Sequence, residues 1–391
     1  MTQRRLLADL SVSAVVAGFV TVLVGFTSSA VIVFQAAAAA GAGPREIGSW
    51  MGALGIGMGV TCILLSLRYR VPVVTAWSTP GAAMLITGVA GVPMAESVGA
   101  FLVSALLITA SGFSGAFERV MTRIPGSIAA GMLAGVLLRF GLEVFVAAKT
   151  QPSMVLAMLF AYLFARRWVP RYAVLLALAA GVAIALAQGS LALGSVSLSL
   201  AQPVFTAPQF SAGALFGVAL PLFVVTMASQ NVPGVAVIRA SGYTVPISPV
   251  IGWTGVATLL LAPFGAFALN LSAITAAICM GPEAHEDPDK RYTAAVSCGL
   301  IYVVIGLFGA AVTGVLTAFP RELVVAVAGL ALLGSIGGGL AVAVKDEQHR
   351  EAALITFLVT LSGVTLAGIG SAFWGVVAGA LALAVQSWRR T

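Results

Sequence analysis

Charged side chains are scarce in this sequence. Asp, Glu, Lys and Arg make up 8% of its 391 residues and apolar types make up 60%, whereas soluble domains contain about 25% charged and about 45–50% apolar residues. The mean hydropathy is +1.07 over the whole length, so nearly every segment has to face lipid or the inside of a membrane bundle. The composition excludes a soluble protein and predicts a polytopic membrane protein.

Cysteine and histidine are also rare. The three cysteines, Cys62, Cys279 and Cys298, lie in or beside apolar runs at spacings that match no metal site and no disulfide scaffold. His285 and His349 leave little material for histidine chemistry, so we expect no metal and no cofactor. The net charge is +7, but the Lys and Arg residues are scattered singly or in pairs, which excludes a nucleic-acid-binding patch.

Apolar runs recur along the chain between charged residues or Pro and Gly. Each crossing of a bilayer needs about 20 residues, so the length accommodates about fourteen crossings with short connections. The expected spans are roughly 11–36, 47–67, 71–88, 97–118, 126–147, 152–165, 171–188, 212–237, 248–263, 266–280, 293–318, 322–344, 351–369 and 371–387.

An even number of spans places both termini on one side of the membrane. If that side is the cytoplasm, sixteen of the twenty Lys and Arg residues lie inside, Arg45, Lys149 and Arg321 lie outside, and Arg139 lies within a span. The positive-inside rule therefore predicts a multi-pass protein of the bacterial inner membrane with both termini cytoplasmic.

The chain reads as two copies of one unit. Seven spans per copy force the second copy to be inverted, as in many transporters. Pro125 and Pro320, at the starts of spans five and twelve, are 195 residues apart, and Ser78 and Ser272 are 194 apart. We predict inverted repeats at 1–188 and 212–391, joined by an extracellular segment at 189–211.

Spans three and ten contain helix-start signals midway. Ser78 or Thr79 can act as N-cap before Pro80 in span three, and Asn270 and Ser272 are cap-type residues in span ten. Half-helices starting at the bilayer centre present unpaired N–H groups, and two facing ends bind an anion without Lys or Arg. In the alternative, Pro80 only kinks a continuous helix, and the polar residues bond to a neighbouring helix.

Three segments carry a resemblance to a known family: Phe223–Gly234 in span eight, Asn270–Gly281 in span ten, and the loop Gly281–Tyr292. Across essentially the whole chain, the sequence resembles the benzoate membrane transport proteins of the BenE type, described as benzoate/proton symporters. This family is similar to uracil/nucleobase and sulfate-permease transporters. The resemblance implies a core of spans 1–4 and 8–11 that moves against a gate of spans 5–7 and 12–14. It also implies a substrate site between the half-helices of spans three and ten, beside spans one and eight.

Benzoate is a carboxylate on an apolar ring, so it needs anion donors at one end and apolar or aromatic walls at the other. The expected donors are the backbone and side chains at Ser78, Thr79, Asn270 and Ser272. The other expected site residues are Trp77, Phe26, Phe267, Gln230, Asn231 and Ser28. In the alternative, the aromatic residues only pack in the core, and the polar residues 229–231 only form hydrogen bonds between helices. A polar run within an apolar span nevertheless favours a substrate pathway, because its polar groups need a cavity or satisfied partners.

The carrier of the coupled proton is not evident from the sequence. The nucleobase branch has a glutamate in both span eight and span ten, whereas this sequence has no Asp or Glu midway in either. The candidates are the carboxyl of benzoic acid itself, Glu118, Glu143 and His285. Glu143 lies four residues after Arg139, which favours a structural ion pair. The acidic loop 281–292 is predicted to be a hydrogen-bonded connection rather than a metal site.

Small residues recur at helix-packing spacing. We expect close helix contacts at Gly48/Gly52, Gly55/Gly59, Gly131/Gly135 and Gly375/Gly379. A homodimer through spans five and twelve is expected only by analogy with the related fold.

The sequence predicts an all-α secondary transporter that imports benzoate or a similar aromatic carboxylate with a proton by alternating access. Its partners are then the small-molecule substrate, the proton and the lipid bilayer. A nucleobase or inorganic-anion permease of the same fold and an anion channel remain as alternatives. An enzyme is disfavoured because no nucleophile with a base, and no pair of carboxylates, lies within the spans.

Overall fold

The fold is almost entirely helical, with one short two-stranded sheet. The computed structural model describes residues 6, 8–89, 91–121, 125–191, 200–308, 319–364, 366 and 371–388. The helices in chain order are α2 (Val12–Ala39), α3 (Pro44–Tyr69), α4 (Thr79–Gly88), α5 (Met94–Phe113), α6 (Ala116–Met121), α7 (Gly126–Ala147), α8 (Pro152–Trp168), α9 (Ala173–Ala187), α10 (Ala212–Ala214), α11 (Leu220–Thr226), α12 (Val232–Ala240), α13 (Ile247–Leu261), α14 (Ile274–Met280), α15 (Tyr292–Leu307), α17 (Arg321–Lys345), α18 (Arg350–Ser362) and α19 (Ser371–Trp388). The strands are β1 (Thr75–Trp77) and β2 (Leu269–Leu271).

Helices occur at each of the apolar runs expected from the sequence. Within the described ranges, seven helical segments are long and apolar enough to cross a membrane. They are Pro44–Tyr69, Met94–Phe113, Gly126–Ala147, Ala212–Ala240, Ile247–Phe264, Pro288–Leu307 and Arg321–Lys345. The protein is therefore a multi-pass membrane protein.

Two helix boundaries bear on the sequence predictions. The fourth predicted span, 97–118, is too long at its end, because α5 stops at Phe113 and Glu118 belongs to the separate short helix α6. Pro125 and Pro320 are the N-caps of α7 and α17, and both have an extended backbone, with ψ of 147° and 140°. Helices α7 and α17 therefore begin in the same way, each after a proline with extended backbone.

The sheet joins two regions of the chain that are far apart in sequence. β1 and β2 pair in antiparallel register, with Thr75 opposite Leu271 and Trp77 opposite Leu269. Two further backbone bonds extend the pairing, from Ser78 N to Ala268 O at 3.0 Å and from Ser272 N to Val74 O at 2.9 Å. Extended backbone deep in an apolar protein is tolerated where its polar groups are satisfied in this way.

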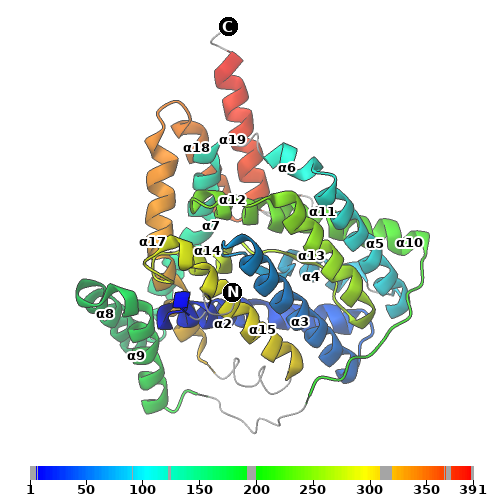
Figure 1. The fold of residues 1–391 in the computed structure, drawn as a ribbon, viewed down its shortest axis with the longest axis horizontal. Helices are drawn as coiled ribbons and strands as arrows, with labels where there is room; N and C mark the ends of the chain where they lie inside the picture. Colours follow the sequence, from blue (N-terminus) through cyan, green and yellow to red (C-terminus); the bar gives the residue numbers. More distant parts are fainter. Residues whose placement is uncertain are drawn as a thin grey trace.

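Close backbone contacts explain most of the predicted glycine pairs. A Cβ at Gly55 would lie 2.7 Å from Gly306 Cα, and one at Gly59 would lie 2.6 Å from Gly299 O, so α3 and α15 touch through their backbones (Figure 1). The pairs Gly131/Gly135 and Gly375/Gly379 similarly face α18. Gly48 is the exception, because a Cβ there would have nothing within 4 Å among the described residues.

The helices of the second half interleave with those of the first. Helix α7 packs with α17 and α18, and α18 packs with α19. Helices α8 and α9 form a pair at one edge of the molecule, as Figure 1 shows. The part of the connecting segment that is described is bonded to the bundle: Ala201 N donates to Leu307 O at 2.8 Å, and Gln209 N donates to Ala95 O at 2.9 Å.

Candidate functional site

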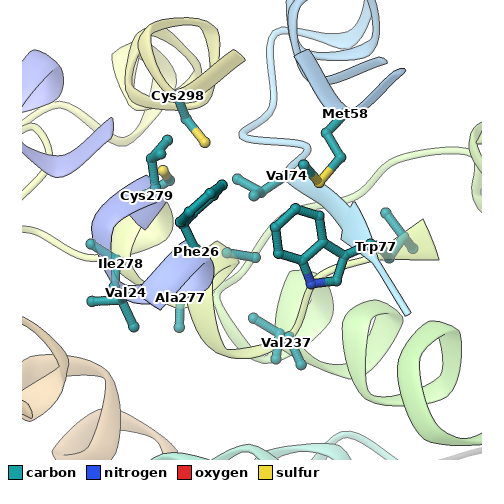
Figure 2. Packing of buried hydrophobic residues seen from close by; sticks show 14 of the residues in the cluster. Val24, Phe26, Met58, Val74, Trp77, Val237, Ala277, Ile278, Cys279 and Cys298 are labelled. Carbon is teal, nitrogen blue, oxygen red and sulfur yellow. The ribbon is translucent and has the colours of Figure 1, made fainter. Parts of the chain in front are cut away.

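Two of the predicted aromatic residues lie together at the sheet. Phe26 on α2 and Trp77 on β1 have ring centroids 5.8 Å apart, and their side chains face each other in the core (Figure 2). Trp77 Nε1 donates a hydrogen bond to Ser29 Oγ at 2.9 Å, which fixes the orientation of the indole. The two rings form an apolar wall beside the point where β1 leads into α4.

Two other predicted site residues do not join this wall. Phe267 is fully buried against Trp50 and Phe101, with ring centroids 6.2 Å from each, so it belongs to a separate aromatic cluster. The side chain of Ser28 lies outside the described part of the structure.

The start of α4 is capped by a side chain. Ser78 Oγ accepts a hydrogen bond from Gly81 N at 3.1 Å, which is the N-cap contact that the Ser-Thr-Pro sequence predicts. Thr226 of α11 donates to the same hydroxyl oxygen at 3.0 Å. Thr79 is the first residue of α4. A threonine in an apolar run gives no sequence signal, so the contribution of Thr226 was not predicted.

Asn270 joins β2 to the start of α4. In the amide orientation that satisfies both neighbours, its Oδ1 accepts from Ser78 N and its Nδ2 donates to Leu271 O, both at 2.9 Å. The residue is fully buried. Its amide therefore stabilises the junction between β2 and the start of α4.

The polar run of span eight lies in a turn of unusual geometry. Residues Met227–Asn231 form the π-helical turn η3, and π turns often occur at functional sites. Asn231 is fully buried, and its Oδ1 accepts from Leu271 N of β2 at 3.0 Å. Gln230 is partly buried, and its side-chain amide makes no hydrogen bond to any described residue. The turn thus presents one amide to the sheet and leaves the neighbouring amide available.

The start of α14 differs from the prediction. Its N-cap residue is Ala273, with no side-chain cap, whereas the Ser272 hydroxyl bonds to the Thr275 hydroxyl at 2.5 Å. The predicted cap at Ser272 is therefore wrong, because a nearer side-chain partner takes its hydroxyl. Among the described residues, no side chain caps the N–H groups in the first turn of α14.

A cavity of about 390 Å³ adjoins the start of α14. Its lining residues come from α7, α14, α18 and α19: Val136, Arg139, Phe140, Glu143, Ile274, Thr360 and Ser371. Arg139 and Glu143 both line it, but the expected ion pair between them does not form. The Arg139 guanidinium instead packs against Gly363, the left-handed residue that ends α18, where the negative end of the helix dipole attracts a cation.

The other two candidates for proton transfer, Glu118 and His285, each accept a hydrogen bond from a nearby backbone N–H group. Glu118 Oε2 accepts from Ser248 N at 3.0 Å at the start of α13. In the loop after α14, His285 Nδ1 accepts from Asp287 N at 3.0 Å, and Arg291 donates to His285 O at 2.8 Å and to Met280 O at 2.9 Å. This loop is hydrogen-bonded as predicted. Within the described ranges, no three side chains of metal-binding type lie together.

The loop after α14 contains a buried carboxylate that no sequence pattern indicated. Glu283, in the loop after α14, is 8% exposed, and its Oε1 lies 2.6 Å from Arg166 Nη1 of α8. These residues are 117 positions apart, so no local spacing pairs them.

Comparisons with known proteins agree with the resemblance. The model of the family "Benzoate membrane transport protein" matches residues 8–385. The chain is 49% identical to the inner membrane protein YdcO of Escherichia coli, covering 94% of each chain. It is 42% identical to the benzoate membrane transport protein of Acinetobacter baylyi, covering 96% of this chain and 95% of that protein.

A solved structure shows the same type of fold. The structure of SLC26A9 aligns with a TM-score of 0.51 at 12% identity, covering 97% of this chain and 66% of that chain. Given the family match and the two relatives, the chain belongs to the benzoate membrane transport protein family, whose members are transporters rather than enzymes.

Proposed function

We propose that this protein is a secondary active transporter that takes up benzoate or a similar aromatic carboxylate together with a proton. It lies in the bacterial inner membrane with both termini in the cytoplasm and crosses about fourteen times as two inverted repeats. Spans 1–4 and 8–11 form the core, and spans 5–7 and 12–14 form the gate. The name of the Acinetobacter baylyi relative supports the choice of substrate.

The pairing of β1 with β2 is the observation that carries this proposal. Because the strands are antiparallel, α4 and α14 leave the sheet in opposite directions, and each begins within three residues of its strand. Both positive helix ends therefore lie beside one small sheet, and this arrangement attracts an anion without a lysine or arginine. The uncapped first turn of α14 supplies N–H donors for a carboxylate.

The surroundings of the sheet suit an aromatic ring. Phe26 and Trp77 supply a wall, and Gln230 supplies an amide that makes no hydrogen bond within the described residues. Asn231, Asn270, Ser78, Thr79 and Ser272 complete the proposed site from span eight and the two broken spans. The cavity that reaches Ile274 has a volume of about 390 Å³, within the range of about 300–1,000 Å³ that holds small ligands. It provides the approach to this site.

Uptake of labelled benzoate into proteoliposomes tests the proposal. With an imposed inward proton gradient, the wild-type protein accumulates benzoate, and a proton ionophore abolishes the accumulation. Protein-free liposomes, which correct for diffusion of benzoic acid through lipid, are the control. Accumulation that does not depend on the gradient would rule out symport.

Two further measurements separate the alternatives. Thermal stabilisation by sulfate or uracil but not by benzoate would favour a permease of the same fold with another substrate. Steady single-channel currents in a planar bilayer would favour an anion channel.

A further inference from the structure

The ion pair between Glu283 and Arg166 connects the two proposed moving parts. We propose that Glu283 is the proton-binding residue of the transport cycle, and that its protonation releases a latch between core and gate. This inference rests on the proposed function, since α14 belongs to the core and α8 to the gate. It supplies an acidic group at the end of span ten, where the middle of the span has none.

The latch is a compact cluster of three side chains. Glu283 Oε1 lies 2.6 Å from Arg166 Nη1 and 3.5 Å from the Tyr162 hydroxyl. Arg166 also donates to the Tyr162 hydroxyl at 2.7 Å, and Tyr162 is 1% exposed. Arg166 and Tyr162 both lie on α8, so a single carboxylate holds the loop after α14 against that helix.

The carboxylate is also enclosed by a second gate helix. A Cβ at Gly334 of α17 would lie 3.1 Å from Glu283 Oε1 and 3.4 Å from Oε2. Glu283 Oε2 is buried and has no hydrogen-bond partner in the described part of the structure. An ionised carboxylate oxygen that is buried without a protein donor is costly, and a proton on that oxygen removes the cost.

Arg166 is the positively charged side chain that pairs with the Glu283 carboxylate. A small cavity of about 10 Å³ at the carboxylate is lined by Ser13, Val16, Ala17, Val174, Leu175, Ile278 and Ala331. This volume is about the smallest that holds one water molecule, which can pass a proton to Oε2. Among the described side chains that line this cavity or bond to Glu283, only Arg166 and Tyr162 are titratable.

The proposed step binds one proton and breaks one ion pair. A proton from water adds to Glu283 Oε2, the carboxyl becomes neutral, and Arg166 loses its counter-charge. The loop and α8 then separate, and the partly exposed guanidinium is solvated. Loss of the proton to water on the cytoplasmic side restores the charge, and the ion pair closes the latch again.

The Glu283→Gln variant tests the coupling, because glutamine keeps the shape and removes both the charge and the proton site. Two assays are compared: exchange of labelled benzoate without a gradient, and accumulation driven by a proton gradient. We expect exchange to persist and gradient-driven accumulation to be lost. The exposed Glu286 of the same loop gives the matched control, Glu286→Gln, which retains both activities.

The outcomes separate the two proposals. Accumulation by Glu283→Gln at the wild-type level would overturn the latch while leaving the transport function intact. A wild-type protein with neither exchange nor accumulation of benzoate would contradict the proposed function instead.

A distance measurement tests the latch without any substrate. Cysteines replacing Arg167 of α8 and Glu286 of the loop, both exposed positions, carry spin labels, while the native cysteines are buried. In the otherwise wild-type protein, we expect the distance between the labels to increase from alkaline to acidic pH. With Glu283→Gln added, it should stay long at both. A distance that is independent of pH in the protein with Glu283 would overturn the inference.

Discussion

At the residue scale, buried polar side chains near the sheet divide into those that hold the backbone and those left for a ligand. The amide oxygens of Asn231 and Asn270 accept from Leu271 N and Ser78 N, whereas the side-chain amide of Gln230 bonds to no described residue. The sequence predicted that residues 229–231 are functional as a group. It could not assign separate roles, because the π-helical turn changes which side chain faces the sheet.

Gln230→Ala should strongly reduce benzoate uptake and leave thermal stability unchanged. The amide contributes no hydrogen bond to the fold within the described residues, so its loss affects only the proposed ligand. Proteoliposome uptake and the melting temperature are measured together. Gln202→Ala, in the exposed connecting segment, is the control, and wild-type uptake by Gln230→Ala would mean that the site is misplaced.

Asn270→Ala should reduce both uptake and stability. The substitution removes the amide hydrogen bonds to Leu271 O and to Ser78 N, although Ser78 N keeps its bond to Ala268 O. A buried hydrogen bond that is lost costs about 0.5–1.5 kcal/mol. A lower melting temperature with weakened uptake, at retained expression, is the expected result. Unchanged stability would show that the amide does not hold the junction.

The carboxyl of Asp9 gives the protein a stability that depends on pH. Tyr292 Oη and Arg70 Nη1 donate to Asp9 Oδ2 at 2.7 Å and 2.8 Å, and the Tyr292 bond is the main reason that the pKa of Asp9 lies below 3.8. A lowered folded-state pKa stabilises the protein above the unfolded-state pKa, and the effect is lost as pH falls through the folded-state value.

Asp9→Asn should therefore melt at a lower temperature than the wild type at neutral pH, and the difference should shrink below about pH 4. Thermal unfolding in detergent at several pH values measures this. Glu286→Gln, at an exposed position, controls for a general loss of charge. A difference that stays constant down to acidic pH would contradict the role of the Asp9 carboxylate.

At the scale of elements, hydropathy predicted where the helices lie. The capping residues predicted the first residue of a helix in one case and failed in another. Ser78 caps α4 as its sequence predicts, because Ser before Thr-Pro is a strong local signal. Ser272 does not cap α14, because Thr275 competes for its hydroxyl. The π turn η3 and the separation of α6 from α5 depend on packing across the bundle, which a local pattern does not contain.

Gly55→Ala should destabilise the α3–α15 contact, whereas Gly48→Ala should not. A Cβ at Gly55 would lie 2.7 Å from Gly306 Cα, and one at Gly48 would meet nothing within 4 Å. Overpacking of this kind costs about 1–3 kcal/mol, while alanine favours the helix by about 1 kcal/mol over glycine. Melting temperatures of the two variants in the same detergent give the comparison, and equal values would contradict the close contact.

At the scale of the whole molecule, the arrangement depends on contacts between the two halves of the chain. The pairs Thr75–Leu271 and Arg166–Glu283 link residues more than 100 positions apart. The family resemblance implied that spans three and ten lie together, and the paired strands are consistent with it. No sequence signal paired Arg166 with Glu283, because such contacts depend on how the helices cross.

The distribution of Lys and Arg predicts the sidedness of the molecule. A cysteine replacing Gln202 in the connecting segment should react with a membrane-impermeant maleimide on intact spheroplasts. A cysteine replacing Glu347, whose side chain is 87% exposed between α17 and α18, should react only after the membrane is disrupted. The reversed pattern would invert the topology, and the buried native cysteines keep the background low.

The two strands are held together by main-chain atoms, with Ala76 opposite Asn270 at the centre of the ladder. Hydrogen bonds of this type persist when side chains are exchanged, since every residue except proline carries the same donor and acceptor. Side chains around the sheet can therefore change to accept a different ring while the two helix starts remain in place. If the proposed site is correct, the recognised ring can change at such side chains while the main-chain pairing beside the two helix starts is kept.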